Sequence, residues 1–249
     1  MEKPLLEIAC FDEESAVNAA KGGADRIELC QDYVSGGLSA DATVLASLKS
    51  RLSIPIFAMI RPHARSFYYD DVDFEEMKAT LENLKSVGAD GFVFGILQQS
   101  KQDQSNEIDI KRNTQLVQLA DGRPCTFHRA FDLIPESRWN TSLSDLNKCG
   151  FSSILTSGGF AGNKAEDNIS ALSRLFRCNL SSSPDLKNRA INVIVGGGVR
   201  STNVRRLWEE TRCRIFHSSA IIGDDHIVSK EEVSEMKDAI DKASGGLQD

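Results

Sequence analysis

The stretch LLEIACFDEESAVNAAKGG, residues 5–23, holds one strand pattern and one helix pattern in quick succession. Residues 5–10 form a short apolar run that is typical of a buried strand. Residues 12–23 then carry a helix pattern, and Gly22 lies where that helix is expected to end. This strand–helix unit indicates the fold, because the same succession returns along the whole chain.

Strand patterns return at seven further places, each followed by a helix pattern: 26–30, 54–62, 91–97, 125–132, 152–159, 192–199 and 214–220. The helices expected over 73–88 and 229–244 have capping-box spacing at their starts, in Asp73 with Glu76 and in Ser229 with Glu232. Eight strand–helix units in 249 residues predict a single (β/α)8 TIM-barrel domain over residues 1–249. A doubly wound open sheet is the alternative, because its strands and helices also alternate.

Charge and cysteine usage limit the kinds of partner. The formal net charge is -7 at pH 7, and an acidic surface argues against nucleic acid and anionic membranes. No apolar run approaches the roughly 20 residues that span a bilayer, and the N-terminus lacks a signal-peptide pattern. The six cysteines are scattered without CxxC pairs, which favours reduced thiols. We therefore expect a cytoplasmic protein with no nucleic-acid or membrane partner.

Polar residues recur late in the predicted strands, and the strands of a barrel converge on one mouth at their carboxyl ends. They are Glu7, Glu28, Arg61, His128, Thr156 and His217. We expect the catalytic residues of an enzyme among Glu7, Glu28, Arg61 and His128, with His128 as general acid or base and a glutamate as the carboxylate that favours its charged form. The same charges could instead form a buried ion-pair network that only fills the barrel.

The alternation of side chains along a strand predicts which residues face the barrel interior. Ile27 and Leu29 suit the helix-covered face, so Glu28 and Cys30 are expected to point inward. By the same argument Glu7 and Ala9 point inward on the first strand, whereas Ile8 and Cys10 do not. On the third strand, Met59 and Arg61 share the inner face.

Glycines follow the sixth and seventh strands, in TSGG (156–159) and GGG (196–198). Bare backbone N–H groups can cradle an anion, and many barrels bind phosphate beside strands seven and eight. We therefore consider Gly158, Gly159, Gly197 and Gly198, together with Arg129, as candidate anion-binding residues. The alternative is that these glycines only make tight turns.

Seven motifs in order resemble the CutC copper homeostasis family: SAVNAAKGGADRIELC (15–30), MIRP (59–62), GADGFVFG (88–95), TFHRAFD (126–132), ILTSGG (154–159), GGGV (196–199) and FHSSA (216–220). The resemblance extends from Leu5 to about Ile222. It implies a TIM barrel, a cytoplasmic location, a homo-oligomer and a role in copper handling.

The resemblance also implies two cysteines, on the first and second strands, as Cu(I) ligands. Cys30 matches the second of them. Ala9 occupies the position of the first, and Cys10 follows one residue later. A shift of one residue turns a strand side chain to the other face, so Cys30 is the better candidate metal ligand and Cys10 the weaker one.

Three functions remain open at this point. The first is a copper homeostasis protein that binds a copper ion. The second is a TIM-barrel enzyme that acts on a small anionic or phosphorylated metabolite, with Arg61 and Arg129 as the anion clamp. The third is a scaffold whose charges at the mouth pair only with one another.

Overall fold

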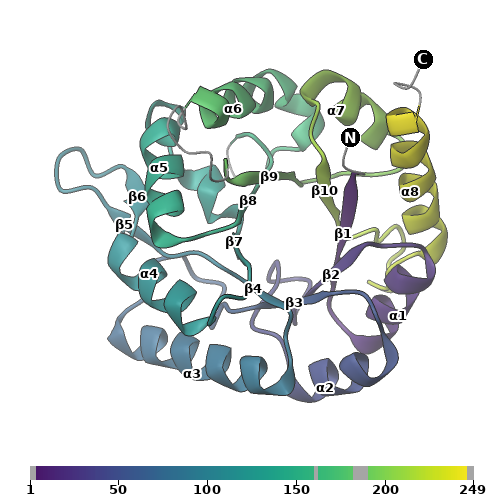
Figure 1. Cartoon of the computed structure of the whole chain (residues 1–249), viewed down its shortest axis with the longest axis horizontal. Coiled ribbons are helices and arrows are strands. Elements are labelled where there is room, and N and C mark those ends of the chain that lie inside the picture. Colours follow the sequence, from purple (N-terminus) through teal and green to yellow (C-terminus); the bar gives the residue numbers. More distant parts are fainter. Residues whose placement is uncertain (1–3, 160–161, 182–189, 246–249) are drawn as a thin grey trace.

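The structure, a computed structural model, describes residues 4–159, 162–181 and 190–245. Its barrel strands close in the order β1–β10–β9–β8–β7–β4–β3–β2, with parallel neighbours throughout (Figure 1). The predicted (β/α)8 TIM barrel is therefore confirmed. The open sheet is wrong, because β1 pairs with both β2 and β10 and leaves no free edge.

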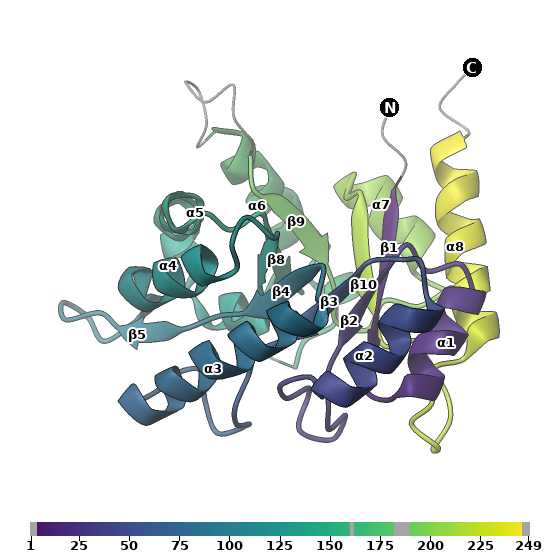
Figure 2. The same cartoon turned by 60° about the horizontal axis from the view of Figure 1, so that its bottom comes forward.

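The barrel strands are β1 Leu5–Cys10, β2 Arg26–Leu29, β3 Ile56–Met59, β4 Gly91–Phe94, β7 Cys125–Phe127, β8 Ser153–Thr156, β9 Asn192–Val195 and β10 Ile215–Ser218. The helices surround the barrel (Figures 1 and 2). They are α1 Glu13–Lys21, α2 Ala42–Arg51, α3 Asp71–Val87, α4 Ile110–Leu119, α5 Trp139–Cys149, α6 Ile169–Ser181, α7 Val204–Thr211 and α8 Lys230–Gly245. In the described part of the chain, three short 3-10 helices lie in the loops: η1 Arg129–Leu133, η2 Glu136–Arg138 and η3 Ala165–Asp167.

The strand predicted over 91–97 is in fact two strands. β4 ends at Phe94, and Leu97 opens an antiparallel hairpin of β5 Leu97–Gln99 and β6 Asn106–Ile108. The hairpin projects away from the barrel between β4 and α4 (Figure 1). Asn113 on α4 holds the point of separation, because its side chain bonds both the N–H and the carbonyl of Ile96.

The strand predicted over 125–132 is also shorter than expected. β7 ends at Phe127, and η1 begins at Arg129. The turn is made by His128, whose Nδ1 accepts a hydrogen bond of 3.3 Å from the N–H of Ala130. Charged residues 129 and 132 are therefore not strand residues, and they lie on a tight turn at the end of β7.

Alternation along the strands divides the buried side chains into two groups. Leu6, Ile8, Ile27 and Leu29 belong to the large apolar core between barrel and helices. A smaller group consists of Cys30, Phe57, Met59 and Val93, which are on the opposite faces of their strands. Gly91 makes room for the Phe57 ring, since a Cβ there would lie 2.6 Å from the ring.

The start of α3 differs from the prediction by three residues. Asp70 is the N-cap, and it forms a capping box with Asp73, so the predicted pair Asp73–Glu76 is wrong. The predicted cap at Ser229 is present, since its Oγ accepts from the N–H of Glu232 at 3.2 Å. The Glu232 carboxylate instead bonds Ser201, where it ties α8 to the loop before α7.

Candidate functional site

A cavity of about 330 Å³ opens where the barrel strands end. Its lining includes three arginines, Arg61, Arg129 and Arg200, and one carboxylate, that of Glu28. Cys30, His128 and His217 line it as well. Of the candidate catalytic residues, Glu28, Arg61 and His128 therefore line one cavity. Glu7 does not line it, but it contacts His217, which does.

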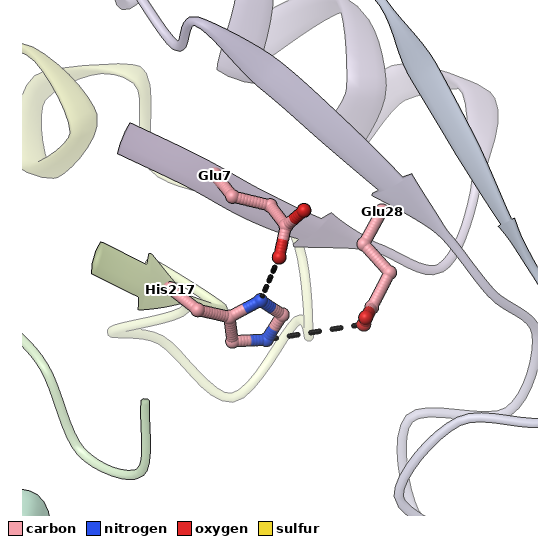
Figure 3. Close-up of side chains that lie close together, drawn as sticks. All are labelled: Glu7, Glu28 and His217. Atoms are coloured by element: carbon pink, nitrogen blue, oxygen red, sulfur yellow. Dashed lines mark hydrogen bonds and ion pairs between the residues drawn. The ribbon is translucent and has the colours of Figure 1, made fainter. Parts of the chain in front are cut away.

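Two buried glutamates from β1 and β2 and the partly buried His217 from β10 form an acidic cluster, shown in Figure 3. Pairing of β1 with β10 puts Glu7 opposite His217, and His217 Nδ1 lies 2.7 Å from Glu7 Oε1. The other ring nitrogen, Nε2, lies 3.8 Å from Glu28 Oε2. The possible ligand atoms of these three residues all fall within 4.8 Å of one another, so the cluster could hold a metal ion.

Opposite protonation states are stabilised within this cluster. Burial acts to raise the pKa of Glu7, but Arg26 and His217 outweigh it and lower the pKa to about 2. Burial raises the pKa of Glu28, against the effect of His217. Burial acts to lower the pKa of His217, but Glu28 and Glu7 outweigh it and raise the pKa. Glu7 is therefore an ionised carboxylate that fixes the imidazole ring, and His217 is the residue that favours a proton.

Arg26 forms an ion pair with Glu7. Its Nε donates to Glu7 Oε2 at 2.6 Å, and its guanidinium lies over the Phe57 ring, 4.2 Å from the centroid. The Glu7 side chain has no exposed surface, so its charge is stabilised by Arg26 and His217 rather than by water. This arrangement meets the requirement that a buried carboxylate be paired.

Cys30 and Cys10 have different surroundings. Cys30 lines the cavity, and its Sγ donates to Glu28 Oε2 at 3.6 Å. Cys10 belongs to the core that faces the helices, and its Sγ donates to the carbonyl of Ile8 at 3.6 Å. Burial raises the pKa of both thiols well above the ordinary value. Of the two candidate ligands, the fold brings only Cys30 to the cavity.

His128 is separated from the acidic cluster. Phe67 packs on its ring at 4.7 Å between centroids, and the Arg61 guanidinium lies over Phe67 at 5.0 Å. Burial, and then the charge of Arg61, lower the pKa of His128 to about 3. His128 is therefore neutral, which corrects the expectation that a glutamate favours its charged form.

The neutral ring has a defined tautomer. Nδ1 accepts from the N–H of Ala130, so the proton is on Nε2, an atom without a hydrogen-bond partner among the described residues. His128 is thus a hydrogen-bond donor. Arg61 is fixed by the loop after β2, because its Nη1 donates to the carbonyls of Ser35, Gly36 and Gly37.

Arg129 and Asp132 brace the end of β8. Arg129 Nε donates to Asp132 Oδ2 at 2.8 Å, and its Nη2 donates to Ser157 Oγ at 3.0 Å. Asp132 also accepts from the Thr156 hydroxyl at 2.5 Å and from the Ser157 N–H. The Arg129 guanidinium therefore has a fixed orientation at the rim of the cavity.

The two glycine turns have different roles. Gly197 and Gly198 line the cavity, whereas Gly158 and Gly159 do not. The N–H of Gly158 donates to Thr156 Oγ1 at 2.9 Å, and a Cβ at this residue would lie 2.6 Å from Leu172. Gly159 packs in the same way against Asn168. The tight-turn alternative therefore fits residues 158 and 159.

The sequence predicts His217 at the mouth but not among the catalytic candidates, although it is the centre of the acidic cluster. The available signal was its late position in the eighth strand, in FHSSA. The choice between His128 and His217 depends on which strands are neighbours. β10 closes the barrel against β1, whereas β7 lies between β4 and β8, far from both glutamates in strand order.

Comparison with known proteins gives one consistent family. A family model described as the CutC family matches residues 4–222. A human protein described as copper homeostasis protein cutC homolog is 37% identical over 216 residues, which cover 87% of this chain and 73% of that protein. A Caenorhabditis elegans protein of the same description is 34% identical over 248 residues, 98% of this chain and 87% of that protein.

Solved structures agree on the fold. A Streptococcus agalactiae structure assigned to copper homeostasis as CutC has a TM-score of 0.76 and 27% identity, and the match covers 87% of this chain and 98% of that chain. N-(5'-phosphoribosyl)anthranilate isomerase from Pyrococcus furiosus has a TM-score of 0.62 at 14% identity, over 96% of this chain and 99% of that chain. At that identity the likeness shows the barrel alone.

Proposed function

This chain belongs to the CutC family, and from that membership we propose that it serves copper homeostasis by binding a copper ion in the barrel cavity. The observation that carries the proposal is the line of donors Cys30 Sγ, Glu28 Oε2 and His217 Nε2, with successive separations of 3.6 Å and 3.8 Å. Thiolate and imidazole are ligands that copper prefers. Cys30, His217 and Glu28 would hold the ion, and Cys10 would not.

The surroundings of these donors support a metal site. Glu28 Oε1 is buried without a hydrogen-bond partner among the described residues, which leaves it available to a cation. Glu7 bonds the far nitrogen of His217, and a carboxylate in that position typically orients a metal-binding imidazole. Because the Cys30 thiol is protonated in the metal-free protein, copper binding should release a proton.

We also place the protein in the cytoplasm. No disulfide joins the cysteines of the described residues, as is usual in a reducing compartment. Within the described residues, none of the helices combines the length and the apolar character that a membrane crossing requires.

Titration of purified protein with Cu(I) against a competing chelator tests the copper proposal. Cys30→Ser should lower the affinity for Cu(I), because it removes a direct ligand. The loss should exceed the roughly 10- to 100-fold that is typical when a residue bonded to a ligand is changed. Cys10→Ser is the matched control, since it makes the same change at a buried thiol outside the cavity, and it should retain wild-type affinity. Equal losses in the two variants would contradict the assignment of Cys30.

One further observation favours a second candidate function, an enzyme that acts on a small anionic metabolite. The Glu7–His217 pair is oriented as in many acid–base sites, and it lies in a cavity lined by three arginines. In this function Glu28 and His217 move a proton, Glu7 orients the imidazole, Arg61 and Arg129 hold the charge of the substrate, and the neutral His128 donates a hydrogen bond from Nε2.

Incubation with a pool of cellular anionic metabolites, followed by mass spectrometry, tests the second candidate. Wild-type protein should convert one component, and Glu28→Gln should abolish the conversion, because glutamine cannot accept the proton. His128→Gln should reduce it less, since glutamine still donates a hydrogen bond. Cys10→Ser is expected to behave as wild type. An unchanged pool with wild-type protein would count against catalysis.

A further inference from the structure

We propose that Gly197, Gly198 and Arg129 form a subsite for a phosphate monoester at the rim of the cavity. This subsite rests on the second candidate function and names its substrate class, a small phosphorylated molecule. Its phosphoryl group lies at the glycine turn, and the rest of the molecule extends toward Glu28 and His217. All of these residues line the same cavity of about 330 Å³.

The glycine turn presents free donors. Neither the N–H of Gly197 nor that of Gly198 donates to another described residue, whereas their carbonyls accept from the Ala165 N–H and the Asn203 side chain. Both glycines have positive φ, 96° and 74°, and a Cβ at Gly197 would lie 2.9 Å from Ser157 Cβ. The turn therefore requires glycine, and it leaves two backbone N–H groups without a hydrogen-bond partner among the described residues, a form that suits anions.

Two arginines, Arg129 and Arg200, line the cavity together with this turn. Arg129 comes within reach of the turn, because its Cζ would lie 3.5 Å from a Cβ at Gly197. Its Nε and Nη2 are bonded within the protein, which fixes the guanidinium, and Nη1 has no hydrogen bond to another described residue. Arg200 ties the loops after β9 and β10 together through the carbonyls of Val199 and Ile221 and the hydroxyls of Ser218 and Ser219.

The charge of the cavity favours an anion, although the chain carries a formal charge of -7. Of the described residues, three arginines and one carboxylate, that of Glu28, line the cavity. Asp132 is paired with Arg129. Arg61 adds a second observation, because it is only 9% exposed and its Nε has no hydrogen-bond partner among the described residues. An unneutralised cation in a cavity is stabilised by a ligand of opposite charge.

The test uses inorganic phosphate as the probe, followed by amide NMR on the full chain. Phosphate should shift the resonances of Gly197 and Gly198 in a saturable way, and those of Gly158 and Gly159 should stay in place as controls within the molecule. Acetate at equal ionic strength should shift them far less. Arg129→Lys should weaken phosphate binding about tenfold or more, because lysine loses the fixed planar donors. Arg205→Lys makes the same change on the exposed face of α7 and should have no effect.

Each outcome decides the proposal. Unmoved Gly197 and Gly198 resonances at saturating phosphate, or equal shifts with acetate, would overturn the subsite even if the metabolite assay shows turnover. Saturable shifts without turnover would leave the subsite standing and remove the enzyme. If Arg129→Lys fails to fold, the comparison of phosphate with acetate on the unaltered chain still decides the proposal, because it needs no substitution.

Discussion

Two histidines reach one cavity, and their pKa values are shifted in opposite directions. His128 is buried beside Arg61, which with burial lowers its pKa to about 3, so it is neutral. His217 is bonded to Glu7 and faces Glu28, and the two carboxylates raise its pKa against the effect of burial. Residue type alone therefore does not define the role of a histidine, because the neighbouring charges set its proton affinity.

We predict that His217 keeps its proton to a pH above its ordinary pKa of 6.5 in metal-free protein. The charged groups around it are Glu7, Glu28, Arg26 and Arg129. Because the folded protein binds this proton more tightly than the unfolded chain does, its contribution to stability is present below pH 6.5 and is lost as the pH rises through the folded-state pKa.

Histidine side-chain NMR over a pH series checks this prediction. Glu28→Gln should lower the titration midpoint of His217, because the charge of Glu28 has the largest electrostatic effect in favour of the protonated ring. Glu82→Gln, an exposed change on α3, should leave the midpoint unchanged. A wild-type midpoint at or below 6.5 would contradict the prediction.

At the scale of elements, strand ends and helix starts are decided by single polar side chains. His128 ends β7 by accepting the N–H of Ala130, and Asn113 separates β4 from the hairpin by bonding Ile96. Asp70 opens α3 by accepting the N–H of Asp73 at 2.9 Å. These short-range bonds compete with continuation of the strand or loop.

We predict that Asp70→Ala lowers the free energy of unfolding by about 1 kcal/mol, the usual cost of losing an N-cap. Urea unfolding followed by circular dichroism measures the difference. Glu76→Ala is the matched control, because Glu76 is an exposed helix residue that takes no part in the capping box. A larger loss for Glu76→Ala than for Asp70→Ala would restore the cap predicted from the sequence.

At the scale of the whole molecule, closure of the barrel creates the site. Pairing of β1 with β10 joins Glu7 to His217, residues separated by 210 positions in the sequence. The converging strand ends then gather three arginines into one cavity of an acidic chain.

Homo-oligomer formation stays a prediction from the family resemblance. Light scattering on purified protein should give a multiple of 27.3 kDa.

Local patterns predicted the strand–helix units and the direction of many side chains, but they left an open sheet as the alternative to the barrel. Strand and helix periods are properties of neighbouring residues, so the eight strand–helix units and the inward direction of Glu28, Cys30 and Arg61 could be predicted. The same argument placed Cys10 on the face opposite to Cys30. These predictions needed no knowledge of which strands are neighbours in space.

The pairing of strands that are distant in the sequence decides which histidine Glu7 contacts, and with it the proton affinity of that histidine. From the sequence, Glu7 could contact either His128 or His217. The structure decides for His217, because β10 and not β7 pairs with β1. The glycines after β8 and β9 look alike in the sequence, yet only Gly197 and Gly198 reach the cavity, because Gly158 packs on Leu172 and Gly159 on Asn168. The physical reason is that electrostatic and packing energies depend on distances between atoms, and for residues far apart in the chain those distances exist only after the barrel has closed.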